Sequence, residues 1–153
     1  MLDPLDQKIL ALLQKDATRS QSEIAAEVQL STSTVSDRIR QLQNNGIIKN
    51  TVVTLYASEL GLNILAFISV LIDWNKSNHS FVRVVETMPQ VLECHHVTGD
   101  WSYLLKVRAR DNVELEDLIS NKIKSLPGVT RSETIFVLNT DKETTALPMP
   151  DFD

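Results

Sequence analysis

The chain has 153 residues, of which 42% are hydrophobic and 23% charged, a composition that fits one ordinary domain or two small packed ones. Its longest apolar run, residues 64–72, is broken only by Ser69 and is about half of what a bilayer requires. The start of the chain is acidic, so neither a membrane helix nor a signal peptide is expected. The net charge of −5 excludes a protein that coats nucleic acid non-specifically, although all of that charge lies in residues 51–153.

Two helices are predicted at the start of the chain. Asp3 and Pro4 are typical of a helix beginning, and apolar residues then recur at helical spacing through residues 5–13. Ser20 and Glu23 have the spacing of a capping box, which predicts the start of a second, shorter helix.

A third helix should follow almost at once, capped by either Ser31 or Ser33 and ended by the left-handed stop at residues 44–46. The β-branched, alternating residues 51–56 then predict a strand, which would form a wing beside the helices.

Beyond residues 59–61 the pattern changes to strands alternating with helices, which divides the chain into domains at residues 1–61 and 62–153. Met88-Pro89-Gln90-Val91 and Leu126-Pro127-Gly128-Val129 both end a helix with proline and begin a strand with valine, 38 positions apart. Two such units in series give the β-α-β-β-α-β order of a ferredoxin-like sandwich, and hence an α+β chain. The expected strands are residues 62–72, 91–97, 103–107 and 129–138, with helices near 81–88 and 115–126.

The strand at residues 62–72 is apolar on both faces. In a ferredoxin-like sandwich the helices cover only one face of the sheet, so the other face needs a second sheet. The sequence therefore predicts a homodimer.

The second and third helices, joined by a tight turn, have the geometry that places a helix in the major groove of double-stranded DNA. Residues 31–50 carry three basic side chains and one acidic, and Arg38 lies off the buried stripe, so we assign it to phosphate or base contact. The same spacing also fits a three-helix bundle with a solvated face, in which the hydroxyl residues are only caps. The candidate DNA-contacting residues are Thr32, Ser33, Thr34, Ser36, Arg38, Arg40, Gln41 and Lys49.

Motifs along the whole chain resemble those of the Lrp/AsnC family, the leucine- and asparagine-responsive regulators. They are Asp3-x-x-Asp6-x-x-Ile9-Leu10-x-x-Leu13, Ser31-x-Ser33-x-Val35-x-x-Arg38-Ile39-x-x-Leu42-x-x-x-Gly46-Ile47-Ile48, Glu59-Leu60-Gly61, and Val97-Thr98-Gly99-Asp100-Trp101-Ser102-Tyr103-Leu104-Leu105. The resemblance implies a winged helix-turn-helix transcription regulator that binds DNA through about residues 22–41. It also implies dimers, often octamers, formed by the C-terminal domain, and a response to an amino acid.

The resemblance makes Thr98, Gly99, Asp100, Trp101 and Ser102 the candidate effector-binding residues, with Thr134 added from the last strand. The family commonly has aspartate where this chain has Ser102, and a hydroxyl offers an ammonium group only a neutral hydrogen bond. The alternative is a tight hairpin in which glycine makes the turn and Trp101 packs at a subunit interface. The turn before the third helix also departs from the family, with Gln29 where glycine is frequent.

Cys94, His95 and His96 form the only metal-like cluster, but neighbouring strand residues point to opposite faces, so we expect strand side chains and no metal, cofactor or catalytic site. One cysteine also excludes an internal disulfide and favours a reducing, cytoplasmic location. Two other functions compete with an effector-controlled regulator. One is a ligand-independent architectural DNA-binding protein. The other is a haem-precursor decarboxylase related to the family, which would use the histidines.

Overall fold

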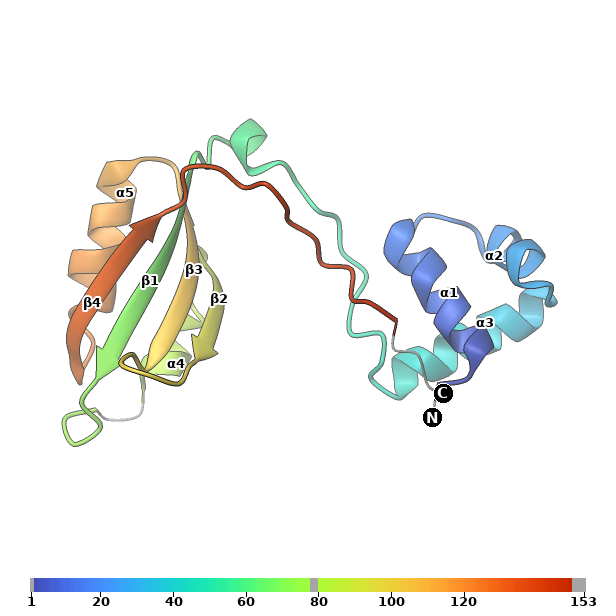
Figure 1. Cartoon of the computed structure of the whole chain (residues 1–153), viewed down its shortest axis with the longest axis horizontal. Helices are drawn as coiled ribbons and strands as arrows, with labels where there is room; N and C mark the ends of the chain where they lie inside the picture. Colours follow the sequence, from blue (N-terminus) through green and yellow to red (C-terminus); the bar gives the residue numbers. More distant parts are fainter. Residues whose placement is uncertain (1, 78–79, 150–153) are drawn as a thin grey trace. The chain divides into compact units, whose positions relative to one another are not determined.

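The computed structural model describes residues 2–77 and 80–149, which form two compact units (Figure 1). The first unit consists of the residues up to Thr54 and the segment from Lys142 onward, and the second is Leu55–Asp141. The assignment of residues 1–61 and 62–153 to separate domains stays a prediction.

Three helices, α1 (Pro4–Lys15), α2 (Gln21–Val28) and α3 (Thr32–Asn44), form the first unit, and their predicted starts are confirmed. The Asp3 carboxylate accepts a hydrogen bond from the Asp6 N–H at 2.8 Å. Ser20 and Glu23 form the predicted capping box, and of the two candidate serines Ser31 caps α3. Each cap pairs a backbone N–H that the first helical turn leaves without a partner.

The core of the first unit holds the three helices together. Ile9, Ile24 and Val35 are completely buried within it, and burying each such side chain contributes about 1.5–3 kcal/mol. The turn between α2 and α3 contains Gln29 in the left-handed region, with φ of 57°. A residue other than glycine in this conformation costs about 1 kcal/mol, so the turn geometry is imposed by the packing of the helices.

The strand predicted at residues 51–56 is wrong. These residues have no regular secondary structure, and Val53 and Tyr56 are each 84% exposed. A β-branched sequence favours a strand only when a neighbouring strand supplies hydrogen bonds and cover, and the described part of the chain places no such strand beside it. Lys49, expected on a wing strand, therefore lies in an irregular segment.

The second unit is a four-stranded antiparallel sheet with helices, and the predicted ferredoxin-like fold is confirmed. The strand order is β2-β3-β1-β4, so the first strand pairs with the third and the fourth. The elements are η1 (Ala57–Leu60), β1 (Ile64–Ile72), α4 (Phe81–Val85), β2 (Val91–His96), β3 (Tyr103–Ala109), α5 (Asn112–Glu116), its π-helical continuation η2 (Asp117–Ile123), and β4 (Val129–Phe136).

The helices cover one face of the sheet (Figure 1). Ile68 on β1 and Leu105 and Val107 on β3 face α4, α5 and η2 and are fully buried. Because strand side chains alternate, the intervening residues face the other way. We call that side the open face, and from the strand registers it carries Phe67, Ser69, Leu71, Leu104, Lys106, Arg108, Arg131, Glu133 and Ile135.

The turn before β4 approaches the end of β1 closely. Gly128 has φ of +88°, and a Cβ built there would lie 2.7 Å from the Ser77 Cβ and 3.0 Å from the Asp73 carbonyl oxygen. Its own carbonyl accepts a hydrogen bond from the Asp73 N–H at 2.8 Å. Both the backbone angle and the lack of space therefore require glycine at this position.

Candidate DNA-binding and effector sites

The N-terminal end of α3 presents hydroxyl side chains to solvent. Thr32, Ser33 and Thr34 are exposed, while Val35, the next residue, is completely buried and anchors the helix. The Ser31 hydroxyl caps α3 by accepting from the Thr34 N–H at 3.1 Å, and it lies 2.7 Å from the Thr34 hydroxyl. The Ser33 hydroxyl also lies 3.0 Å from the Ser31 hydroxyl. The hydroxyls of Ser31, Ser33 and Thr34 are thus partly engaged around the cap, whereas Thr32 has no side-chain partner within the described residues.

Arg38, which the sequence analysis assigned to phosphate or base contact, forms two ion pairs within the first unit. Its Nη1 donates to Asp3 Oδ2 at 2.6 Å and to Asp6 Oδ1 at 2.7 Å, which ties α3 to the start of α1. The hydrogen bond from the Asp6 N–H, followed by that from the Arg38 guanidinium, makes the largest contribution to lowering the pKa of the Asp3 carboxyl below its usual range. Both contacts use Nη1, so Nη2 and Nε keep their donors free of partners among the described residues.

The remaining DNA candidates differ in how far they reach solvent. Arg40, Gln41 and Lys49 are exposed, and Ser36 is partly buried. Arg40 lies 3.3 Å from Asp37, a contact between two side chains that are each about two-thirds exposed and therefore readily separated. Arg40 can exchange this partner for a phosphate at little cost.

The hairpin between β2 and β3 forms the candidate effector loop. Gly99 has φ of +97° and makes the turn, as the sequence predicts, and Thr98 and Asp100 are exposed on either side of it. Asp100 makes no ion pair or side-chain hydrogen bond within the described residues. Its carboxylate is therefore available to a cation.

Ser102 does not lie free beside this loop. Ser102 is only 8% exposed, and its hydroxyl accepts a hydrogen bond from the Ile72 N–H at 3.0 Å. Its own N–H donates to the Val70 carbonyl oxygen at 2.9 Å. The serine thus extends the pairing of β3 with β1, and this hydrogen bond was not expected from the sequence.

The last two effector candidates are separated by the sheet. The Trp101 ring lies under the Arg131 guanidinium, with 4.7 Å between Cζ and the ring centroid. Arg131 is on the open face, whereas Thr134 pairs opposite Ile68 and so lies on the helix-covered face. Strand alternation therefore places Thr134 away from Trp101. Arg131 is absent from the sequence-predicted site residues, because its neighbours Thr130 and Ser132 are polar and no pattern in β4 distinguishes it.

The cysteine and histidines of β2 do not converge. His95 Nε2 lies 3.1 Å from Glu93 Oε2, while His96 packs against the Tyr103 and Trp74 rings, with centroids 5.1 and 6.1 Å away. Burial raises the pKa of the Cys94 thiol, which makes the thiolate scarce. No group of three metal-ligating side chains occurs among the described residues.

None of the described helices combines the length and apolar character that a membrane crossing requires.

Comparison with known proteins covers nearly the whole chain. Residues 2–49 match the model for winged helix-turn-helix DNA-binding domains, and residues 65–147 match the Lrp/AsnC ligand binding domain. The chain is 34% identical to the HTH-type transcriptional regulator FL11 of Pyrococcus furiosus, over 97% of both chains. It is 33% identical to the DNA-binding transcriptional activator DecR of Escherichia coli, over 97% of this chain and 99% of that one. The structure of the transcriptional regulator NMB0573 from Neisseria meningitidis, a complex with L-Met, superimposes with a TM-score of 0.92 at 33% identity, over 97% of each chain.

Proposed function

The chain belongs to the Lrp/AsnC family and is a DNA-binding transcription regulator, and we propose that an amino acid bound at the residue 98–101 hairpin changes its affinity for DNA. In this proposal the protein is a cytoplasmic homo-oligomer, a dimer and possibly an octamer, with no catalytic role and no cofactor. The observation that carries the DNA-binding part of the proposal is the row of exposed hydroxyl side chains at the start of α3, a helix that the buried Val35 anchors.

The start of α3 supplies two kinds of DNA contact. Thr32, Ser33 and Thr34 are short enough to let the helix approach base edges, and the positive end of the helix dipole favours phosphate there. Arg38 is fixed through Nη1 by two aspartates and can offer its remaining donors to a phosphate. Arg40, Gln41, Ser36 and Lys49 would add contacts along the same helix and after it.

The effector half of the proposal rests on Asp100. An unpaired carboxylate beside a glycine turn suits the ammonium group of an amino acid, and the exposed backbone at Thr98 and Gly99 can bond its other polar groups. Ser102 would support the loop through its bond to β1, and Thr134 would contribute only if the loop closed over the edge of β4. The relative from Neisseria is named as a complex with L-Met, which makes methionine the first amino acid to test.

One observation favours a second candidate, a DNA-binding protein without an effector. The Ser102 hydroxyl accepts from the Ile72 N–H in a residue that is only 8% exposed, so it does not replace the family's aspartate as an exposed partner for an ammonium group. In this alternative the hairpin is purely structural and Trp101 packs at a subunit interface.

Selection of genomic DNA fragments with and without each amino acid tests both halves together. We expect a defined set of fragments, and a change in their recovery with at least one amino acid. Thermal shifts on wild type, on Asp100→Asn and on the exposed control Glu116→Gln then locate the ligand. Loss of the shift in Asp100→Asn alone supports the hairpin site, whereas flat shifts with every amino acid in wild type would establish the ligand-independent alternative.

A further inference from the structure

The side chain of Gln14, in the last turn of α1, binds the backbone of the C-terminal segment at residues 142–149, which we call the tail. Gln14 Nε2 donates to the Leu147 carbonyl oxygen at 3.0 Å, and the Leu147 N–H donates to Gln14 Oε1 at 2.7 Å. The two residues are 133 positions apart in the sequence, and both belong to the first unit. The glutamine amide thus pairs with Leu147 as a residue of a neighbouring antiparallel strand would, by exchanging two hydrogen bonds with it.

The sequence of the tail prepares Leu147 for this contact. Pro148 restricts the residue before it to extended conformations, in which the N–H and C=O of that residue point to the same side. Just before Leu147, the Thr144 hydroxyl accepts from the Ala146 N–H at 3.1 Å, which orders the approach to the contact. Pro148 has no N–H of its own, so strand-like pairing ends there. Gln14 therefore binds one defined residue of the tail.

Burial of apolar side chains next to both partners extends the contact. Among the described residues 138–149, Met149 alone is partly buried, and all the others are exposed. On α1, Leu10 lies one turn before Gln14 on the same side of the helix. Leu10 is only 8% exposed, although it does not belong to the core that the three helices form. The end of the tail and the neighbouring surface of α1 are thus both withdrawn from water.

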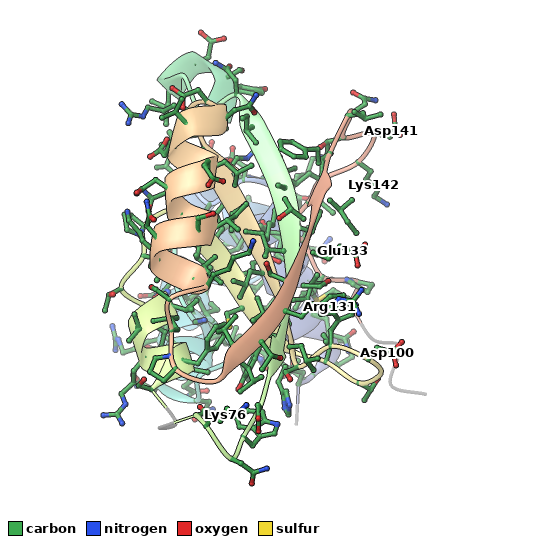
Figure 2. All side chains as sticks on the ribbon, turned by 90° about the vertical axis from the view of Figure 1, so that its left-hand side faces the viewer. Lys76, Asp100, Arg131, Glu133, Asp141 and Lys142 are labelled. Carbon is green, nitrogen blue, oxygen red and sulfur yellow. The ribbon has the colours of Figure 1, made fainter. Side chains whose placement is uncertain are left out.

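The tail gives the first unit a second covalent connection to the sheet. The chain passes between the two units at residues 54–55 and again at residues 141–142 (Figure 1). Figure 2 shows Asp141 and Lys142 beyond the end of β4, with side chains that point away from the sheet, and both residues are exposed. A unit that is held by two segments has less orientational freedom than a unit held by one, so a docked tail restricts the helices that bind DNA.

We propose that the surface of α1 around Gln14 is a docking site for the chain's own tail, and that docking narrows the range of operator geometries that the protein accepts. The docking stands on contacts within one chain. Its effect on operators rests on the homo-oligomer in the proposed function, because only an oligomer binds two half-sites at once. Each exposed hydrogen bond favours the docked state by only about two- to tenfold, so the tail can leave and return.

Hydrogen exchange at the Leu147 amide, followed by NMR in the full chain, tests the docking. Gln14→Leu keeps a good helix former of similar size, removes both hydrogen bonds, and should speed the exchange about tenfold. Gln21→Leu, at an exposed glutamine of α2, is the matched control and should leave the exchange unchanged. Unchanged exchange in Gln14→Leu would overturn the docking. Protection in wild type that disappears on dilution would show that another copy supplies the tail, which contradicts docking within one chain.

Gel shifts test the effect on operators, using a recovered operator and a copy whose half-sites are moved apart by five base pairs, about half a helical turn. The move should cost wild type about 100-fold in affinity, but only about tenfold in Gln14→Leu and in a chain that ends at Glu143. Combining both changes should have no further effect, because Gln14 acts only through the tail. Equal losses in wild type and in both variants would refute the operator role, and so would a further effect of Gln14→Leu in the shortened chain.

The two measurements separate this inference from the proposed function. A wild-type chain whose affinity does not depend on the spacing of half-sites would overturn the operator role and the proposed homo-oligomer together. Exchange at Leu147 is measured on the free protein, so the docking is judged without DNA and without an amino acid.

Discussion

Replacement of Arg38 separates its two roles, one within the fold and one on DNA. Arg38→Ala removes two charge-assisted contacts, to Asp3 at 2.6 Å and to Asp6 at 2.7 Å. The Arg38 side chain is 26% exposed and those of Asp3 and Asp6 are 44% and 16% exposed, so solvent weakens both contacts. We expect the free energy of unfolding of the first unit to fall by about 1–2 kcal/mol.

The same substitution should also weaken DNA binding, and by more than the small loss of stability accounts for. Loss of one phosphate contact costs about tenfold in affinity and reduces the slope of log K against log salt by about one. Gel shifts on a recovered genomic fragment, run at several salt concentrations, measure both quantities. Denaturant unfolding of the same samples measures stability.

Asp6→Asn is the decisive control, because it breaks one ion pair while leaving the guanidinium in place and removing a nearby negative charge. It should lower the free energy of unfolding by about 1 kcal/mol and leave DNA affinity unchanged or higher. If Asp6→Asn weakened DNA binding as much as Arg38→Ala does, Arg38 would be only a tie between α1 and α3. Unchanged affinity and salt slope in Arg38→Ala would refute the DNA contact directly.

Four further predictions concern stability, each checked by denaturant unfolding. Gly128→Ala should lower the free energy of unfolding by about 3 kcal/mol, because it adds a Cβ where backbone and side-chain atoms lie within 3.0 Å at a φ of +88°. Gly61→Ala, at a φ of +72° with nothing within 4 Å, should lower it by only about 1 kcal/mol. Equal losses would mean that the loop around Gly128 moves to make room for the added Cβ. Ser102→Ala should cost about 1–3 kcal/mol because it leaves a buried N–H of β1 without its acceptor, and a neutral result would show that the hydroxyl is replaceable. Gln29→Gly should raise the free energy of unfolding by about 0.5–1 kcal/mol by relieving a left-handed φ of 57°, and an unchanged or lower value would show that this backbone angle stores no strain. Glu114→Gln should destabilise the second unit at neutral pH, because hydrogen bonds from the Arg110 N–H and from the Gln90 side chain lower the pKa of Glu114 from 4.5 to about 2. The loss in free energy of unfolding relative to wild type should shrink as the pH falls from 4.5 to about 2. A loss that stays constant with pH would contradict the lowered pKa of Glu114.

The sequence by itself determined the parts that depend on local interactions. Asp3 and Ser20 cap their helices because an N-cap needs only a side-chain oxygen near the next N–H groups, a relation visible within four residues. For the third helix the sequence narrowed the cap to Ser31 or Ser33, and the structure selects Ser31. The repeated Pro and Val boundaries likewise fixed the β-α-β-β-α-β order, since strand and helix patterns are set by the period of buried residues. Hydroxyl residues at the start of α3 and glycine at the tip of the hairpin follow from the same local reasoning.

Contacts between distant segments were decided only by the tertiary structure. Arg38 meets Asp3 and Asp6 because α1 and α3 pack together, and no spacing in the sequence pairs residues more than thirty positions apart. Ser102 looked like a weakened ligand residue, yet the register of β3 against β1 turned its hydroxyl towards the Ile72 N–H. The strand expected at residues 51–56 failed for the complementary reason, since β-propensity acts only when another strand lies beside it. Helix caps and periodic burial are properties of one segment, whereas ion pairs, strand pairing and the two faces of a sheet are properties of two.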